Sequence, residues 1–206
     1  EEEKARREAS VVFALGADSG KILWSLRNAV ARGTTVCAAE VNGKRYALAA
    51  GHDGYLRLLR PRTGEVVWKE YLGVPHRVQP IVADGRAFVL RAREPDPAAL
   101  KPAEEGMLTA YALSEAGAKL LWQSKQPLSG IMAWTPMSYR DGVVYAELGV
   151  AKTQCTIHAL KAEDGTVLGR AAAKGKGFSV FFFWGDRVIL PSDVAHESMG
   201  FGCSYT

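Results

Sequence analysis

An eleven-residue phrase recurs four times along this chain of 206 residues. Its copies begin at residues 14, 58, 112 and 159, so successive copies are 44, 54 and 47 residues apart. The four segments read ALGADSGKILW, LLRPRTGEVVW, ALSEAGAKLLW and ALKAEDGTVLG. A repeat of this length cannot bury its own apolar face, so neighbouring copies must stack on one another to form a core. The sequence therefore predicts a row of similar structural units.

Each unit has the pattern of short strands separated by tight turns. The second unit shows four runs rich in β-forming residues, which are 36–41, 45–50, 55–59 and 65–72. The turn between the first two runs carries a Gly beside Asn or Asp, namely Asn42-Gly43, Asp84-Gly85, Asp141-Gly142 and Gly185-Asp186. These pairs suit the positive φ angles of a two-residue hairpin turn. Four antiparallel strands in each repeat predict an all-β chain folded as a β-propeller, with one blade per repeat.

The repeats divide the chain into whole and partial blades. We predict a charged tail at residues 1–9, and blades at 10–33 (partial), 34–74, 75–128, 129–174 and 175–206 (partial). Unit one begins at what resembles a third strand, and unit five stops before its repeated phrase. The favoured interpretation is a partial ring of a seven- or eight-bladed propeller. The alternative is a closed four-bladed ring, in which unit five completes the blade begun by residues 10–27.

Composition narrows the classes of function. The formal net charge of +4 is small and the basic residues are spread out, so no nucleic-acid partner is expected. Arg57, Arg60 and Arg62 lie close together along the chain and are interpreted as a solvated face. The sequence contains no run of eighteen apolar residues, so no transmembrane helix is predicted. The cysteines form no Cys-x-x-Cys pair that would indicate a metal or redox site, and Cys37, in an apolar strand, is expected to be a buried, inert thiol.

The repeated phrase resembles the tryptophan-docking motif of the pyrroloquinoline-quinone (PQQ)-like β-propeller family, Ala-x-Asp-x-x-Thr-Gly-x-x-x-Trp. The positions that carry the resemblance are Ala14, Gly20 and Trp24 in unit one, Thr63, Gly64 and Trp68 in unit two, Ala112 and Trp122 in unit three, and Ala159 and Gly165 in unit four. Unit three has Gly117 and Ala118 where the motif has Thr-Gly, and unit four has Gly169 in place of Trp. No unit keeps the Asp.

The Gly and Trp of this motif are expected to be structural. Glycine allows the turn, and an indole on the outer strand covers the joint with the neighbouring blade. Burying such a side chain contributes roughly 2–3 kcal/mol. We therefore predict that Trp24, Trp68 and Trp122 hold blades together rather than bind a cofactor.

The resemblance leaves two functions open. Catalytic members of the family hold PQQ and Ca²⁺ on the propeller axis, using an Asp base, carboxylate and amide ligands, and often a disulfide of adjacent cysteines. This sequence has no adjacent cysteine pair and no recognisable calcium-ligand string. The favoured function is therefore that of the non-catalytic, BamB-like members, with no catalytic residue, metal or cofactor. The alternative is a PQQ- and Ca-dependent alcohol or sugar dehydrogenase whose site is completed from outside this chain, in which Trp134 and Trp184 stack on the quinone rather than plug the channel.

Two insertions interrupt the repeat between the second and third strands of their units, at residues 94–106 and 192–202. Loops at equivalent places project from one face of a propeller, and such loops often bind other molecules. The candidate partner-binding residues are Pro95, Lys101, Glu104, Asp193, His196 and Glu197. The resemblance implies unidentified protein partners, a larger complex and a periplasmic or other extracytoplasmic location in bacteria. A WD40-like scaffold ranks last, because the Trp-Asp dipeptide of that repeat is missing.

Overall fold

A computed structural model describes residues 11–27, 36–51, 53–73, 79–98, 106–125, 137–151, 154–174, 182–184 and 187–189. Within these ranges every regular element is a β-strand, and the strands form five antiparallel sheets. Three sheets have four strands, and the first and last sheets have two. The predicted all-β propeller fold is confirmed. The predicted tail at 1–9 lies outside the described residues.

The sheets follow one another along the chain, and each four-stranded sheet pairs its strands in sequence order. Blade one contains β1 (Val11–Leu15) and β2 (Ile22–Arg27). Blade two contains β3 (Cys37–Val41), β4 (Lys44–Ala50), β5 (Tyr55–Leu59) and β6 (Val66–Tyr71). Blade three contains β7 (Ile81–Ala83), β8 (Arg86–Arg91), β9 (Met107–Ser114) and β10 (Gly117–Gln123). Blade four contains β11 (Met137–Arg140), β12 (Val143–Ala151), β13 (Gln154–Lys161) and β14 (Val167–Lys174), and blade five contains β15 (Phe182–Trp184) and β16 (Arg187–Ile189).

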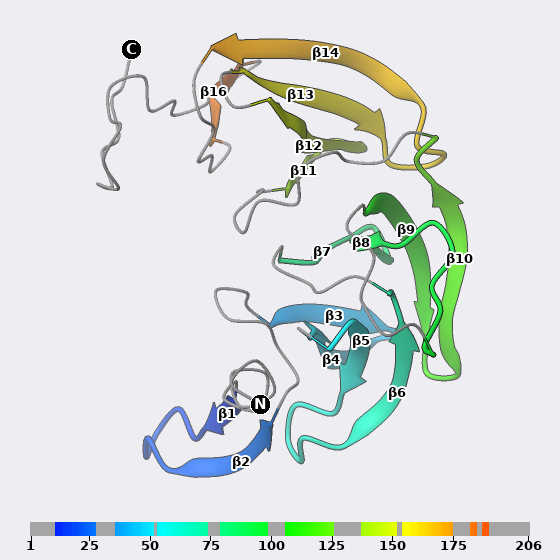
Figure 1. Ribbon diagram of the computed structural model, residues 1–206. Coiled ribbons are helices and arrows are strands. Elements are labelled where there is room, and N and C mark those ends of the chain that lie inside the picture. The colour runs from blue at the N-terminus through cyan, green and yellow to red at the C-terminus, as the bar shows by residue number, and fades with distance from the viewer. Residues whose placement is uncertain are drawn as a thin grey trace.

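The blades are arranged as an arc (Figure 1). The first strands β3, β7 and β11 lie on its inner side, where β7 contacts both β3 and β11. The fourth strands β6, β10 and β14 lie on its outer side, as does β2. Each of the three four-stranded sheets falls within the residue range predicted for a whole blade.

The first hairpin of each whole blade has the predicted turn chemistry. Asn42 has a φ of +52° and Gly43 one of +73°, and Asp84-Gly85 and Asp141-Gly142 also have positive φ at both residues. Two successive positive φ angles define a type I′ turn, whose twist matches that of the strands that it joins. The turn pairs visible in the sequence therefore set the pairing of the two inner strands.

The core lies where blades meet. Leu56 and Leu58 on β5 are fully buried, as is Phe88 on β8. The Phe88 ring lies 6.0 Å from the ring of Trp122 in its own blade and 6.0 Å from that of Tyr139 in blade four, so one side chain joins two blades. Burying one leucine or phenylalanine side chain contributes about 1.5–3 kcal/mol to the free energy of unfolding. These buried side chains therefore stabilise the packing of one sheet on the next.

Blade one contacts blade two, blade two contacts blade three, and blade three contacts blade four. At each of these three joints, a tryptophan on the outer strand of one blade docks on the next blade. Its indole Nε1–H donates to a backbone carbonyl oxygen at the start of, or within, the turn between the third and fourth strands, which we call the docking turn. The three hydrogen bonds are Trp24 to Pro61 (2.8 Å), Trp68 to Ser114 (2.7 Å) and Trp122 to Ala162 (2.9 Å). The joints are therefore directional, because each blade uses an indole from the blade before it.

Two docking turns need glycine for two separate reasons. Gly64 and Gly165 have φ angles of +73° and +74°. Residues other than Gly, Asn and Asp rarely adopt this left-handed backbone conformation. A Cβ added at Gly64 would also lie 2.6 Å from the Trp24 ring, and one at Gly165 would lie 2.6 Å from the Trp122 ring. The indole ring thus packs directly on the glycine backbone, and any residue with a Cβ at that position would clash with the ring.

The docking turn of blade three is different, and the structure corrects the alignment of the third repeat. Trp122 pairs with Ala110 rather than with Ala112, which pairs with Lys119. The strands continue two residues further towards a shorter turn, so Ala110 is the equivalent of Ala14, Leu58 and Ala159 in the other units. Gly117 has a φ of +149°, and a Cβ there would meet no described atom within 4 Å. No glycine of this turn therefore contacts the Trp68 ring. Trp68 is half-buried, whereas Trp122 is buried.

We predict that Gly165→Ala destabilises the protein more than Gly142→Ala. Both glycines have φ between +74° and +78°, so both changes introduce similar backbone strain of about 1–2 kcal/mol. Only the Cβ at position 165 also displaces an indole, which adds about 1–3 kcal/mol. Urea unfolding of the two variants measures the difference, and equal losses would show that the Trp122 contact contributes nothing.

Candidate functional site

The insertion of blade three is anchored at its base. It follows β8, and the Ala92 N–H donates to the carbonyl oxygen of Leu72 in blade two (2.7 Å). Gln123 on β10 donates its side-chain amide to the Ala92 carbonyl (3.3 Å), and Arg91 Nη1 donates to the Arg93 carbonyl (3.3 Å). The first residues of the loop are therefore held by hydrogen bonds to both blades.

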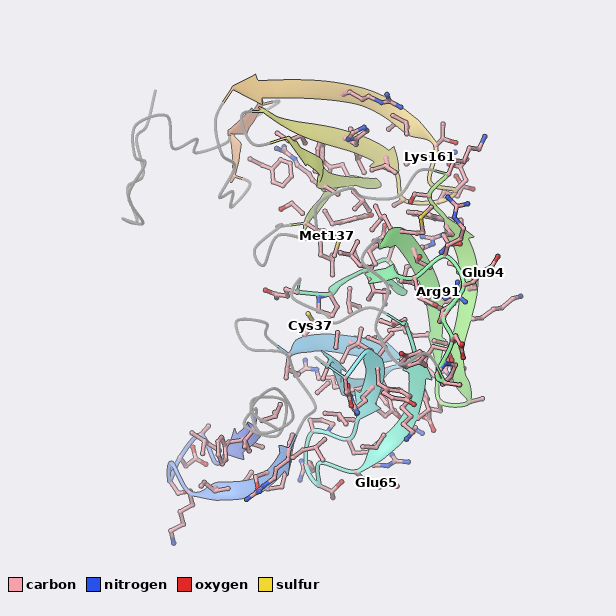
Figure 2. All side chains as sticks on the ribbon, viewed as in Figure 1. Cys37, Glu65, Arg91, Glu94, Met137 and Lys161 are labelled. Atoms are coloured by element: carbon pink, nitrogen blue, oxygen red, sulfur yellow. The ribbon has the colours of Figure 1, made fainter. Side chains whose placement is uncertain are left out.

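The next residues of the loop lie over the edge of blade two. A Cβ added at Gly73 would lie 3.0 Å from Pro95 Cα, so the proline packs directly on this buried glycine. The side chains of Glu94 and Asp96 are exposed on either side of Pro95. Figure 2 shows Arg91 and Glu94 on the side of the arc away from Cys37 and Met137. The described start of the loop, residues 92–98, thus has an anchored backbone and exposed charges.

A group of aromatic and basic side chains lies on β5 and β6. Tyr55 and Tyr71 face each other across the two strands with ring centroids 5.0 Å apart, and Arg57 faces Lys69. Lys69 Nζ is 4.9 Å and Arg57 Cζ is 5.4 Å from the centre of the Tyr55 ring. Like charges opposite each other are unfavourable, and the two contacts with the ring offset part of that cost.

A carboxylate in the preceding turn binds Arg57. Arg57 donates through both terminal nitrogens to the two oxygens of Asp53, with Nη1 2.9 Å from Oδ1. Because its side chain is only 12% exposed, the interpretation of Arg57 as part of a solvated face is wrong. Arg60, in contrast, is exposed and pairs with Glu65 at 3.0 Å.

Electrostatics connect these side chains to the loop. Partial burial raises the pKa of the Tyr71 hydroxyl, and the neighbouring Tyr55 and the negative charge of Asp96 raise it further. The loop carboxylate Asp96 and the tyrosine pair are therefore coupled electrostatically. We call Tyr55, Arg57, Lys69, Tyr71 and residues 93–98 together the loop–tyrosine surface.

The described inner strands lack the residues that a bound Ca²⁺ needs. Ca²⁺ takes six to eight oxygen ligands, with carboxylates prominent among them. Glu40 supplies the one carboxylate in β3, β7, β11 and β15. Among the described residues, moreover, no three His, Cys, Asp or Glu side chains are grouped so that they could hold a metal ion. The inner strands described here therefore do not fit the ligand set of the catalytic family members.

Cys37 on β3 connects blade two to the start of blade three. Its thiol donates to the Pro80 carbonyl oxygen (2.6 Å) and accepts a weak contact from the Gln79 amide (3.7 Å). Burial raises the pKa of the thiol, and the Gln79 contact partly opposes this. A half-buried, protonated thiol of this kind is unreactive, in keeping with a structural role.

The structure describes only some of the residues predicted to bind a partner or cofactor. Pro95 lies in the anchored loop, and Trp184 lies on β15, although the placement of its side chain is outside the described part. The other candidates lie outside the described residues; they are Lys101, Glu104, Trp134, Asp193, His196 and Glu197. The residues that sequence reasoning missed are Tyr55, Lys69 and Tyr71. The sequence signal that could have found them is a Tyr-x-Arg segment on one strand and a Lys-x-Tyr segment on the next, which a hairpin pairs with each other.

The described strands, taken together, define a β-propeller whose blades are joined by docked tryptophans. Within the described ranges no helix is long and apolar enough to cross a membrane. Known structures share the fold. BamB from Moraxella catarrhalis matches with a TM-score of 0.55 and 15% identity, over 92% of this chain and 51% of its own. Quinohemoprotein alcohol dehydrogenase from Comamonas testosteroni matches with a TM-score of 0.55 and 16% identity, over 88% of this chain and 36% of its own.

A protein shorter than BamB and the dehydrogenase also shares the fold. The computationally designed Ika4 protein matches with a TM-score of 0.52 and 12% identity, over 77% of this chain and 86% of its own. The present chain thus spans about half of the BamB chain and about a third of the dehydrogenase. No curated protein has a sequence that matches it.

A sequence comparison defines the family. The family model described as outer membrane protein assembly factor BamB matches residues 8–126, which is more than half of the chain. The chain therefore belongs to this family of PQQ-like β-propellers, and the predicted family is confirmed.

A buried tyrosine beside the loop base yields a prediction for alkaline pH. Burial raises the pKa of Tyr111 to about 12, although Arg91 beside it acts in the opposite direction. The neutral phenol therefore stabilises the fold fully below pH 10, and this contribution of about 2–3 kcal/mol is lost as the pH rises from about 10 to about 12. We expect Tyr111→Phe to flatten the fall in unfolding free energy between about pH 10 and pH 12, as measured by urea titration. An unchanged slope would contradict the assignment.

Proposed function

We propose that this chain is a non-catalytic propeller scaffold that binds a protein partner through the loop–tyrosine surface. The observation that carries the proposal is the anchored loop, in which Pro95 packs on Gly73 while Glu94 and Asp96 are exposed. Binding residues are commonly presented on loops that a rigid scaffold positions. Little conformational entropy is lost when the first residues of this loop, 93–98, bind a partner, because their backbone is already anchored to blades two and three.

The composition of the neighbouring strands supports a protein partner. Tyr and Arg are enriched at the centres of protein interfaces, because each combines a large contact area with directional hydrogen bonding. Tyr55 and Tyr71 are half-buried and already packed on each other, and Arg57 is held by Asp53. The surface carries both signs of charge, which favours a partner with mixed charge over a polyanion such as nucleic acid.

The family suggests the setting. Its model is described as an outer membrane assembly factor, and a bacterial BamB shares the fold. These likenesses support a role in the cell envelope, with the chain in the periplasm or another extracytoplasmic location and part of a larger complex. No cofactor is part of this proposal.

The competing function is that of a PQQ- and Ca-dependent alcohol or sugar dehydrogenase. Its support is a shared fold with dehydrogenases such as the Comamonas testosteroni enzyme, and one fold hosts many functions. The inner strands, with Glu40 as their one carboxylate, argue against it for the described part of the chain.

We expect photo-crosslinking side chains at positions 94 and 96 of the full-length protein to give partner adducts in its native cells. The control position is Glu163, which is exposed on the docking turn at the other end of the strands. Tyr71→Ala should lower the adduct yield about tenfold, because it removes a packed aromatic group from the centre of the surface. Val66→Ala, at a position that is 38% exposed on the same strand, is the matched substitution and should leave the yield unchanged.

Two results would contradict the scaffold proposal. One is an adduct yield at position 163 equal to that at 94 and 96. The other is a quinone absorbance band when the full-length protein is mixed with PQQ and Ca²⁺, accompanied by alcohol-dependent dye reduction.

A further inference from the structure

The outer strand of blade four has the longest regular edge among the described outer strands. Each outer strand contains one extra residue, a β-bulge, where its pairing with the third strand shifts. In blade four this residue is Leu168, and residues 169–174 beyond it pair without interruption with residues 154–159. The corresponding runs are shorter; they are 24–27 in blade one, 68–71 in blade two and 122–123 in blade three.

The other edge of this run pairs with no described strand. Blade four pairs its strands in the order β11-β12-β13-β14, so β14 is the last strand of its sheet. Figure 1 shows β14 at the outer limit of the arc. Alternate N–H and C=O groups of an edge strand point away from the sheet, and they are a template for the pairing of a further strand.

The residues of this run do little to shield the backbone. Their sequence is Gly-Arg-Ala-Ala-Ala-Lys, and Gly169 stands where the other three outer strands carry a tryptophan. Both Gly169 and Ala171 are exposed. Glycine, alanine and lysine are depleted in strands, because they pack poorly on a pleated surface. The run is therefore held by its pairing with β13 more than by its own residues, and a second paired strand would stabilise it.

Exposed apolar side chains lie at the start of the run. Val167 is 44% exposed, and Leu168 in the bulge is 58% exposed. A bulge interrupts regular pairing, so a further strand would pair beyond it, over residues 169–174. An apolar side chain of that strand could then pack on Val167 and Leu168.

A charged side chain beside the edge indicates the sign of the partner. Arg170 is exposed and forms no ion pair with a described residue. The carboxylates of the adjacent docking turn, Glu163 and Asp164, are both bound to Lys161, at 2.8 and 3.7 Å. A carboxylate on a neighbouring strand would therefore find an unpaired guanidinium at this edge.

We propose that residues 167–174 bind an extended, acidic segment of a partner protein, which adds to blade four as a fifth strand. The main chain of the segment pairs with residues 169–174, one of its carboxylates binds Arg170, and an apolar side chain lies on Val167 and Leu168. Main-chain pairing of this kind gives affinity, and the side chains beside the edge give specificity. This surface shares no residue with the loop–tyrosine surface and does not depend on that proposal.

A second copy of this chain does not fit the same edge. Residues 167–174 contain no acidic side chain, so two copies of β14 side by side would bring basic residues together. Like charges opposite each other on neighbouring strands are unfavourable. An acidic strand from another protein makes the favourable pairing instead.

Hydrogen exchange of the full chain with a probe peptide tests the pairing directly. The probe is the capped peptide TVEVTVET, which alternates polar and apolar residues and is acidic. The outward-facing amides of residues 169–174 should exchange freely without the peptide and become protected as it is added, to a saturating level. A peptide of the same sequence with its four central amides N-methylated lacks the donors of a ladder and should protect none of them.

The matched variants are Arg170→Glu and Arg62→Glu. Both arginines are exposed and both substitutions change the net charge equally, so both variants are expected to fold. Arg170→Glu should weaken binding of TVEVTVET about fivefold, because a favourable cross-strand pair becomes a repulsive one. It should also strengthen binding of TVKVTVKT, whereas Arg62→Glu should bind both peptides as the parent does.

Four outcomes would overturn the proposal. One is that TVEVTVET protects no amide of residues 169–174, and another is that the N-methylated peptide protects them equally. The third is that Arg170→Glu binds both peptides with the affinities of the parent. The last is protection of the same amides that rises with the concentration of the chain alone, since a second copy would then be the occupant.

Discussion

The fold depends on one contact, in which an indole lies flat on the backbone of the next blade and donates its N–H to a carbonyl there. Each blade is a narrow sheet that cannot bury its own faces, so its stability comes from its neighbours. A hydrogen bond of 2.7–2.9 Å from the indole orients each joint, and at the Trp24 and Trp122 joints the ring also lies on a glycine. Trp122 is buried, whereas Trp24 and Trp68 are half-buried.

This contact explains why related folds can differ in activity. BamB and a quinohemoprotein alcohol dehydrogenase share the fold of this chain at about the same TM-score. The joints lie at the outer strands, whereas a cofactor on the axis depends on the inner strands, so the two can vary independently. In this chain the outer strands keep the joints, and the described inner strands carry a single carboxylate. Loops set on such a rigid frame are the natural place for partner recognition.

Much of the fold could be predicted from the sequence, because local chemistry specifies it. Asn42-Gly43 and its equivalents specify type I′ turns, and the spacing of Gly64 and Trp68 places one residue in the turn and one on the outer strand. The register of blade three could not be predicted, because spacing alone does not reveal a two-residue extension of the ladder before a shorter turn. The tyrosine pair of the loop–tyrosine surface was missed for a related reason. Tyr55 and Tyr71 meet only through strand pairing, and each is unremarkable in sequence.

Hydrogen exchange of the three indole N–H groups tests the role of the joints most directly. If docked tryptophans hold the blades together, the Trp122 indole N–H should exchange only when blades three and four unfold, with the same free energy as the backbone amides of β9 and β13. Trp24, which is less buried, should exchange sooner. Exchange of the Trp122 indole at the rate of a free indole, while those backbone amides stay protected, would show that the blades are held together by other contacts.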